Sequence, residues 1–391
     1  MLFTPLKLGP LELHNRFVHA STYEAMSSPD GAVTDRLLRR YRTLATGDIG
    51  LIIPGYMYVH ALGRCAPLQV GIERDDRVPG LRRLVETIKR SGSRVAFQLV
   101  HAGRQTSPRY IGARPLGPSS TWRDPAYLVK PRAMTEQEIE QVVDAFGEAA
   151  RRAVEAGVDA VQIQASHGYL VSQFLSPFHN RRRDRWGGSD EGRFRLLREI
   201  VLRIRQRAGE RTPILVKLNV IDHTPRPGVT PEIAARYAGW LAQLGVDGLE
   251  LSQGAPTYAF MPLLRGDVPR AELMRALPWH MRIPGWIWLG SLQGKFPLVS
   301  AYNMPLVDRI RPHAGGAKVA AMGGLRRLDQ MDQIVSEGRA DFIALCRPLV
   351  RQPHLIKLFR DGRTRTSDCR YCNRCFAAVA SHRPVRCHYR R

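Results

Sequence analysis

Short apolar runs alternate along the chain with longer segments in which apolar positions recur at helical spacing. Strands that alternate with helices pair in parallel, and eight such units match a (β/α)8 TIM barrel better than an open sheet. In that fold the chemistry lies at the carboxyl ends of the strands. The predicted strands are 16–22, 50–57, 94–100, 159–165, 214–220, 248–254, 317–323 and 341–346.

Helix-start residues support the predicted helices. Thr135 is followed three residues later by Glu138, which predicts a capping box, and Thr230 precedes Pro231 at a first-turn position. The predicted helices are 34–45, 80–90, 135–155, 191–207, 231–244, 325–337 and 348–359.

Two segments are longer than the connections of a bare barrel. Residues 102–131 are rich in Pro, Ser and Arg, and residues 255–300 contain Trp279, Trp286 and Trp288. Long ordered loops at such positions usually wall or cover a site, so we expect both segments to do so.

The formal charge of +24 does not by itself indicate a nucleic-acid partner. Of 59 basic residues only seven are Lys, and the Arg residues are spread along the whole chain. This pattern favours a solvated basic surface, and no aromatic-plus-basic motif for nucleic acid is present. No stretch approaches the roughly 20 apolar residues of a membrane span, and the first residues lack a signal layout, so we expect a soluble, cytoplasmic protein.

Polar residues within two apolar runs suggest a ligand site. Gln98 could contact the edge of a planar heterocycle, although a satisfied core Gln fits equally well. Lys217, one of seven lysines, lies within 214–220, where an unpaired ammonium would be costly. We therefore expect an anionic or strongly accepting group to face Lys217, and favour this over a structural carboxylate.

The fourth predicted strand leads into a second polar group. Gln164 and His167 could both donate to one carbonyl oxygen, and Tyr169 could deliver a proton nearby. A single His at a strand end is more often structural, so this group alone is a weak signal.

The last two predicted strands end in phosphate-binding chemistry. Gly323 and Gly324 precede one helix, and Cys346 and Arg347 precede another. Backbone amides at helix N-termini together with an Arg form a phosphate site where barrel enzymes commonly hold one. Together with Gln98 and Lys217, they describe a site for a phosphorylated planar cofactor.

Several ordered segments then identify a family resemblance. The chain resembles the old yellow enzyme family of FMN-dependent oxidoreductases, whose fold is an FMN-binding (β/α)8 barrel. The segments that carry the resemblance are Asn15-Arg16-Phe17-Val18, residues 98–104, His167-Gly168-Tyr169-Leu170, residues 174–177, residues 180–189 and Arg347-Pro348.

The resemblance implies roles for the residues already singled out. Gln98 would contact the flavin pyrimidine edge, and Lys217 the N1/C2 carbonyl region, where a cation stabilises the reduced ring. Tyr169 aligns with the proton donor, and His167 and Gln164 with the pair that binds the activating carbonyl of an enone. The remaining FMN contacts would be Ala20 and Ser21 on the central face of the ring and Gly323, Gly324, Cys346 and Arg347 at the phosphate.

Two departures from the family pattern concern the substrate. Gln164 stands where the family usually has His, and it remains a donor but cannot be a cation. The stretch Ala20-Ser21-Thr22-Tyr23 replaces the usual Ser-Pro-Met-Cys or Thr, so the group that tunes the flavin from the first strand differs.

The C-terminal cysteines resemble the iron-sulfur branch of this family, which includes 2,4-dienoyl-CoA reductase and trimethylamine dehydrogenase. Cysteines clustered in this way are unlike a disulfide framework and suggest a metal or an iron-sulfur centre. The resemblance implies a 4Fe-4S cluster in residues 361–391, after an FMN barrel in residues 1–360; a structural zinc is the alternative. The four thiols are Cys369, Cys372, Cys375 and Cys387.

The route of electrons stays open between two alternatives. NAD(P)H reduces FMN directly in the barrel, or a separate electron-transfer protein docks near the cluster. Residues 360–391 carry nine Arg against Asp361 and Asp368, which suits an acidic carrier.

The predicted function is NAD(P)H-linked reduction of an activated alkene in a small-molecule substrate, an enone or enoyl thioester. The enzymatic alternative is an FMN and iron-sulfur dehydrogenase or demethylase that passes electrons to a carrier. A non-catalytic flavin-binding protein and a basic nucleic-acid-binding protein are the alternatives from other classes. The chain could also form a homo-oligomer.

Overall fold

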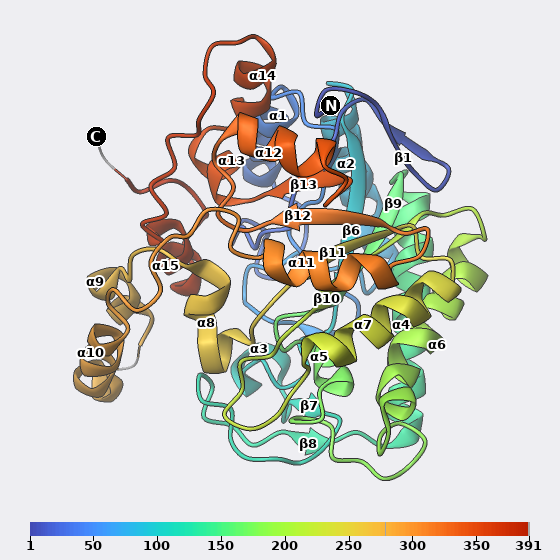
Figure 1. The fold of residues 1–391 in the computed structure, drawn as a ribbon. Helices are drawn as coiled ribbons and strands as arrows, with labels where there is room; N and C mark the ends of the chain where they lie inside the picture. Colours follow the sequence, from blue (N-terminus) through green and yellow to red (C-terminus); the bar gives the residue numbers. More distant parts are fainter. Residues whose placement is uncertain (278, 390–391) are drawn as a thin grey trace.

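Eight parallel strands close into a barrel in the computed structural model, which describes residues 1–277 and 279–389 (Figure 1). Each strand pairs with the next along the chain, and β4 pairs with both β3 and β6, so the ring is closed. The predicted (β/α)8 class is therefore confirmed. The strands are β3 (Phe17–His19), β4 (Leu51–Ile52), β6 (Arg94–Val100), β9 (Ala160–Ala165), β10 (Ile214–Asn219), β11 (Gly248–Ser252), β12 (Lys318–Met322) and β13 (Phe342–Leu345).

Helices surround the barrel and, apart from α11, which was not predicted, lie at the predicted segments within a few residues. Thr135 and Glu138 form the predicted capping box, and the Thr230 side chain caps the helix that Pro231 begins. The outer helices are α1 (Asp35–Ala45), α2 (Val78–Lys89), α4 (Glu136–Glu155), α6 (Asp190–Ala208), α7 (Pro231–Gln243), α11 (Met304–Ile310), α12 (Leu328–Ser336), α13 (Arg347–Arg351) and α14 (Leu355–Arg360).

Proline explains two places where the structure corrects the prediction. The expected helix 348–359 is two helices, α13 and α14, because Pro353 cannot donate a backbone hydrogen bond and forces Gln352 out of helical geometry. The expected strand 50–57 divides at Pro54-Gly55 into β4 and β5 (Met57–Tyr58).

An N-terminal hairpin that the sequence analysis did not predict packs against the inner core of the barrel. β1 (Leu6–Leu8) and β2 (Leu11–Leu13) pair antiparallel, and their buried leucines alternate with exposed polar residues. These leucines pack with small and apolar residues inside the barrel, such as Ala96, Ala160 and Leu215. Their period-two alternation across Gly9-Pro10 is the signal that would have revealed the hairpin.

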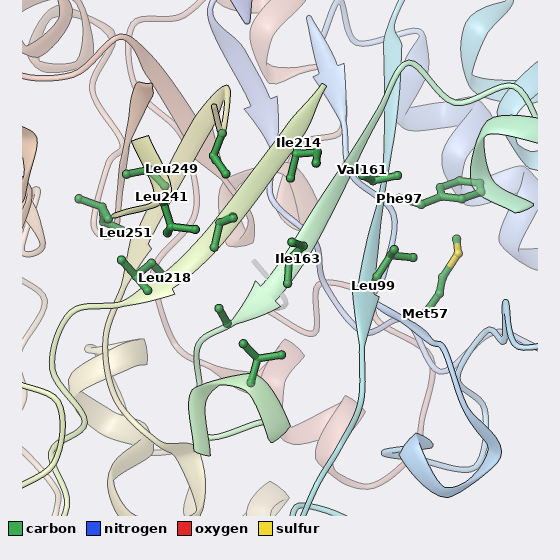
Figure 2. Packing of buried hydrophobic residues seen from close by; sticks show 14 of the residues in the cluster. Met57, Phe97, Leu99, Val161, Ile163, Ile214, Leu218, Leu241, Leu249 and Leu251 are labelled. Atoms are coloured by element: carbon green, nitrogen blue, oxygen red, sulfur yellow. The ribbon is translucent and has the colours of Figure 1, made fainter. Parts of the chain in front are cut away.

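The pleat of each strand separates two cores. Successive side chains point to opposite faces, so one set packs outward against the helices and the other points into the barrel. Figure 2 shows part of the outer set, including Val161, Ile163 and Ile214, with Leu241 of α7 packed nearby. The alternate positions of β6, β9, β10 and β11, which point inward, are where the polar residues lie.

The two long connections contain short elements. Residues 102–131 hold α3 (Pro108–Ile111) and β7 (Leu116–Gly117), which pairs with β8 (Arg132–Ala133), and α5 (Leu170–Leu175) follows β9. Residues 255–300 hold α8 (Pro256–Leu264), α9 (Arg270–Leu273) and α10 (Arg282–Ser291). In Figure 1, α9 and α10 project from the barrel next to α15 (Arg374–Ala380).

No helix in the described part of the chain is long and apolar enough to cross a membrane.

The His19 imidazole on β3 makes folding sensitive to pH. It is fully buried, and burial, with Arg40 nearby, lowers its pKa to about 3. Its Nδ1 shares a hydrogen bond of 3.1 Å with the carbonyl oxygen of Ile53. In the unfolded chain the His19 imidazole takes up a proton near pH 6.5, whereas in the folded chain it stays neutral until about pH 3. His19 therefore lowers the free energy of unfolding as pH falls from about 6.5 toward 3.

We predict that His19→Asn, which keeps a donor toward Ile53, removes this dependence. Between pH 6 and 4 the free energy of unfolding of the native chain should fall more steeply than that of the variant, by up to about 1.4 kcal/mol per pH unit. Urea unfolding at a series of pH values measures the difference. Parallel stability curves for the two proteins would contradict the assignment.

Candidate active site

A row of polar side chains crosses the inside of the barrel on four neighbouring strands. Gln98 Nε2 on β6 donates to Gln162 Oε1 on β9 at 2.5 Å, and Gln162 Nε2 donates to Glu250 Oε2 on β11 at 2.9 Å. Lys217 Nζ on β10 lies 2.9 Å from Glu250 Oε1. All four side chains are buried, so the two residues predicted at a cofactor edge belong to one connected network.

Lys217 faces a structural carboxylate, Glu250, which corrects the expectation that another anionic or strongly accepting group would face it. Glu250 lies directly opposite Lys217 in the register of β10 and β11. A buried ammonium is tolerated here because the carboxylate compensates its charge. The same argument applied to Glu250 within the apolar run 248–254 would have found it, and Gln162 could have been found by its alternation with Gln164.

Two residues expected to contact the flavin have a buried polar atom without a hydrogen-bond partner among the described residues. They are Gln98, whose Oε1 belongs to this row, and Ser21, whose Oγ follows β3. Buried polar atoms are nearly always hydrogen-bonded, so such atoms mark a place where a ligand supplies the partner. The Gln98 carbonyl oxygen and the Lys217 ammonium of the same row suit the polar edge of a flavin, so these residues fit FMN.

Gln164, near the end of β9, and His167 and Tyr169, in the segment that follows, lie at the carboxyl end of the strand. His167 has a left-handed backbone with φ of +60°, and its Nε2 shares a 2.7 Å hydrogen bond with Ser252 Oγ at the end of β11. Gln164 Oε1 accepts from Ser166 Oγ at 2.7 Å, which fixes the amide carbonyl. The structure therefore places the three residues on one segment but gives each its own protein partner.

Tyr169 donates from its hydroxyl to the hydroxyl of Tyr56 at 3.0 Å. Burial and the nearby Cys65 raise the pKa of Tyr169 far above its usual value of 10. Burial and the nearby charge of Lys217 lower the pKa of His167 well below 6.5. At neutral pH the site thus holds a protonated phenol and an uncharged imidazole.

The first long connection reaches this segment, and the second connection contacts the first. Gln105, from the first connection, donates its amide Nε2 to the backbone oxygen of His167 at 2.5 Å. Trp122 Nε1 of the same connection donates to the Tyr258 hydroxyl of the second at 2.8 Å. The tryptophans of the second connection, Trp279, Trp286 and Trp288, are exposed.

The glycine pair after β12 has the geometry that only glycine adopts readily. Gly323 and Gly324 have φ of +94° and +72°, and a Cβ at Gly324 would overlap the carbonyl oxygen of Val299. Cys346 Sγ lies 2.9 Å from Thr22 Oγ1, on the connection that follows β3. The left-handed backbone of the pair requires glycine, and the role of the pair and of Cys346 at a phosphate stays a prediction.

Arg347 turns toward the C-terminal segment. Its Nη1 donates to the backbone oxygen of Arg265 at 3.0 Å and to Asn373 Oδ1 at 2.6 Å, and its guanidinium lies 4.2 Å from the centre of the Tyr371 ring. Arg347, which was expected to bind the phosphate, therefore contacts the cysteine segment, which was expected to be separate from the barrel.

The four C-terminal cysteines line a single cavity and carry free thiols. Arg351 Nη1 lies 3.7 Å from Cys387 Sγ, and Arg347 lines the same cavity. Within residues 1–277 and 279–389, no three His, Cys, Asp or Glu side chains are grouped closely enough to hold a metal ion. Four thiols are a donor set that suits a metal or an iron-sulfur centre, but the described structure does not bring three of them close enough together to form one.

The chain belongs to the NADH:flavin oxidoreductase / NADH oxidase family, whose profile matches residues 1–269. With its barrel and its old yellow enzyme-like relatives, it is an NAD(P)H:flavin oxidoreductase.

Curated relatives of two lengths match the chain. It is 32% identical to 4,4'-dithiodibutanoate disulfide reductase of Rhodococcus erythropolis over 97% of this chain and 93% of that protein. It is also 32% identical to an NADPH dehydrogenase of a Geobacillus species, covering 90% of this chain and 92% of the relative. An NADH oxidase of Thermoanaerobacter brockii is 32% identical over 96% of this chain, which spans only 52% of that protein.

Solved structures repeat the fold. A 2-naphthoyl-CoA reductase complex superimposes with a TM-score of 0.86 at 26% identity, covering 99% of this chain and 56% of that one. An old yellow enzyme homologue from Zymomonas mobilis has a TM-score of 0.74 at 23% identity, covering 94% of each chain.

Proposed function

We propose that the chain reduces an activated alkene, an enone or enoyl thioester, with NAD(P)H as the source of electrons. The observation that carries the proposal is a protonated phenol and a neutral imidazole, Tyr169 and His167, on one segment at the carboxyl end of β9. Two relatives named as reductases, for a disulfide and for 2-naphthoyl-CoA, support the reducing direction.

Each side chain has a defined part in this proposal. His167 and Gln164 donate hydrogen bonds to the carbonyl oxygen of the substrate and so stabilise the negative charge that develops there. Tyr169 holds a proton on its hydroxyl and delivers it to the α-carbon. Tyr56, bonded to that hydroxyl, orients it and shields it from water.

FMN, when bound, supplies the hydride for the β-carbon. Gln98 and Lys217 would hold the polar edge of its ring, and Gln98 Oε1 is a buried acceptor without a partner in the described structure. Ala20 and Ser21 would lie against the ring. The phosphate would be held by Gly323, Gly324, Cys346 and Arg347.

A Tyr169→Phe variant tests the proton donor. We expect alkene reduction to slow by about 10²- to 10⁴-fold, the usual contribution of a positioned acid, while NAD(P)H still bleaches the flavin at the native rate. Anaerobic stopped-flow measurement of the two half-reactions separates these steps. Tyr56→Phe is the matched control, because it removes a hydroxyl from the same contact and should cost less. Full alkene turnover in Tyr169→Phe would remove Tyr169 from the role.

We further propose that Cys369, Cys372, Cys375 and Cys387 bind a 4Fe-4S cluster in residues 361–391, with structural zinc as the alternative. All four thiols line one cavity, and Arg347 and Arg351 on its wall offset the charge of thiolate ligands. The cluster would exchange electrons with an acidic carrier protein at this basic end of the chain. The dehydrogenase or demethylase alternative would use the same route in the opposite direction.

Metal analysis of anaerobically purified protein tests the cluster. We expect about four iron atoms per chain with broad visible absorption near 400 nm, and loss of most of this iron in Cys372→Ser. Cys65→Ser is the control, because Cys65 lies in a different apolar cluster and should leave the iron content unchanged. One zinc per chain would establish the alternative, and neither metal would contradict both.

A further inference from the structure

An ionised Glu250 accepts hydrogen bonds and donates none, and this determines which way the neighbouring amide side chains are turned. Gln162 must turn its Nε2 toward Glu250 Oε2, which leaves Gln162 Oε1 facing Gln98. Gln98 must then donate from its own Nε2, and its Oε1 is the atom left without a protein partner. One carboxylate on β11 therefore fixes the orientation of two amides on β9 and β6.

The free carbonyl oxygen of Gln98 requires a donor on the ligand. The imide N–H in the pyrimidine ring of a flavin is such a donor, and it lies at the ring edge that Gln98 would contact in the proposed function. Because Glu250 fixes the Gln98 amide with its carbonyl oxygen free, the ligand atom that faces this oxygen must be an N–H group and not a second carbonyl oxygen.

Glu250 also changes the charge presented by Lys217. The two groups are 2.9 Å apart, with side chains that are 1% and 4% exposed, so solvent screens their attraction little. A lone ammonium near the ring would stabilise the extra negative charge of reduced flavin. An ammonium paired with a carboxylate is neutral as a unit and stabilises that charge much less.

We propose that Glu250 is a positioning residue that keeps the midpoint potential of bound FMN low and sets the amide orientation of Gln98. The inference rests on the proposed FMN site. Its effect reaches the cofactor through Lys217 on one side and through Gln162 and Gln98 on the other, and Glu250 needs no contact with the ring.

The test is the midpoint potential of the FMN-loaded protein, measured by anaerobic reduction against a reference dye. In Glu250→Gln the carboxylate charge is lost and Lys217 remains, so the ratio of reduced to oxidised flavin at a fixed potential should rise at least tenfold. For a two-electron couple this equals about 30 mV upward. Glu250→Asp keeps the charge and should stay near the native potential.

A double variant keeps the test decisive if Glu250→Gln fails to fold with an unpaired buried ammonium. Lys217→Met/Glu250→Gln removes both charges and should change the same ratio by less than tenfold, because the native pair is neutral as a unit. A drop of tenfold or more, as expected for loss of a lone cation, would overturn the inference. An unchanged potential in a folded, FMN-loaded Glu250→Gln would also overturn it.

Glu138→Gln is the matched control, because it breaks an ion pair with Arg132 at the outer helix α4. It should lower stability slightly through the lost ion pair, because Gln can still complete the capping box, and leave the potential unchanged. If the native chain binds no FMN at all, the proposed function fails. If FMN binds and only the predicted shift is absent, the inference about Glu250 fails alone.

Discussion

The ion pair between Lys217 and Glu250 is the interaction on which the centre of this barrel depends. Two charges inside a protein are tolerated only when each compensates the other and the remaining polar atoms are hydrogen-bonded. Register makes this possible, because Lys217 and Glu250 are direct neighbours on β10 and β11. From that pair the row extends through Gln162 to Gln98, and it ends at an atom that needs a ligand.

The pleat explains why so much of the architecture was predictable. Strands buried on both faces read as apolar runs, and a polar residue at an inward position, such as Lys217 or Gln98, interrupts the run visibly. The alternation therefore revealed both the number of strands and two members of the polar row. Helix boundaries followed from local chemistry at Thr135 and Thr230, which depends on neighbouring residues only.

Features that depend on contacts between distant segments could not be predicted in this way. The partner of Lys217 lies on another strand, and the sequence gives no direct measure of which residues share a register position. Arg347 is another example, since its contact with Asn373 joins the end of the barrel to the cysteine segment. The packing of α9 against α15 is a third example, because it places part of the long connection 255–300 beside the cysteine segment.

If the polar row forms the edge of a flavin site, FMN binding depends on Gln98. Calorimetric titration of FMN into flavin-free protein, native and Gln98→Leu, tests it most directly. We expect one FMN per chain and binding at least about fivefold weaker in the variant, because a buried acceptor is lost, which is worth about 1–3 kcal/mol. Equal affinity for the two proteins, or no binding of FMN to the native chain, would contradict it.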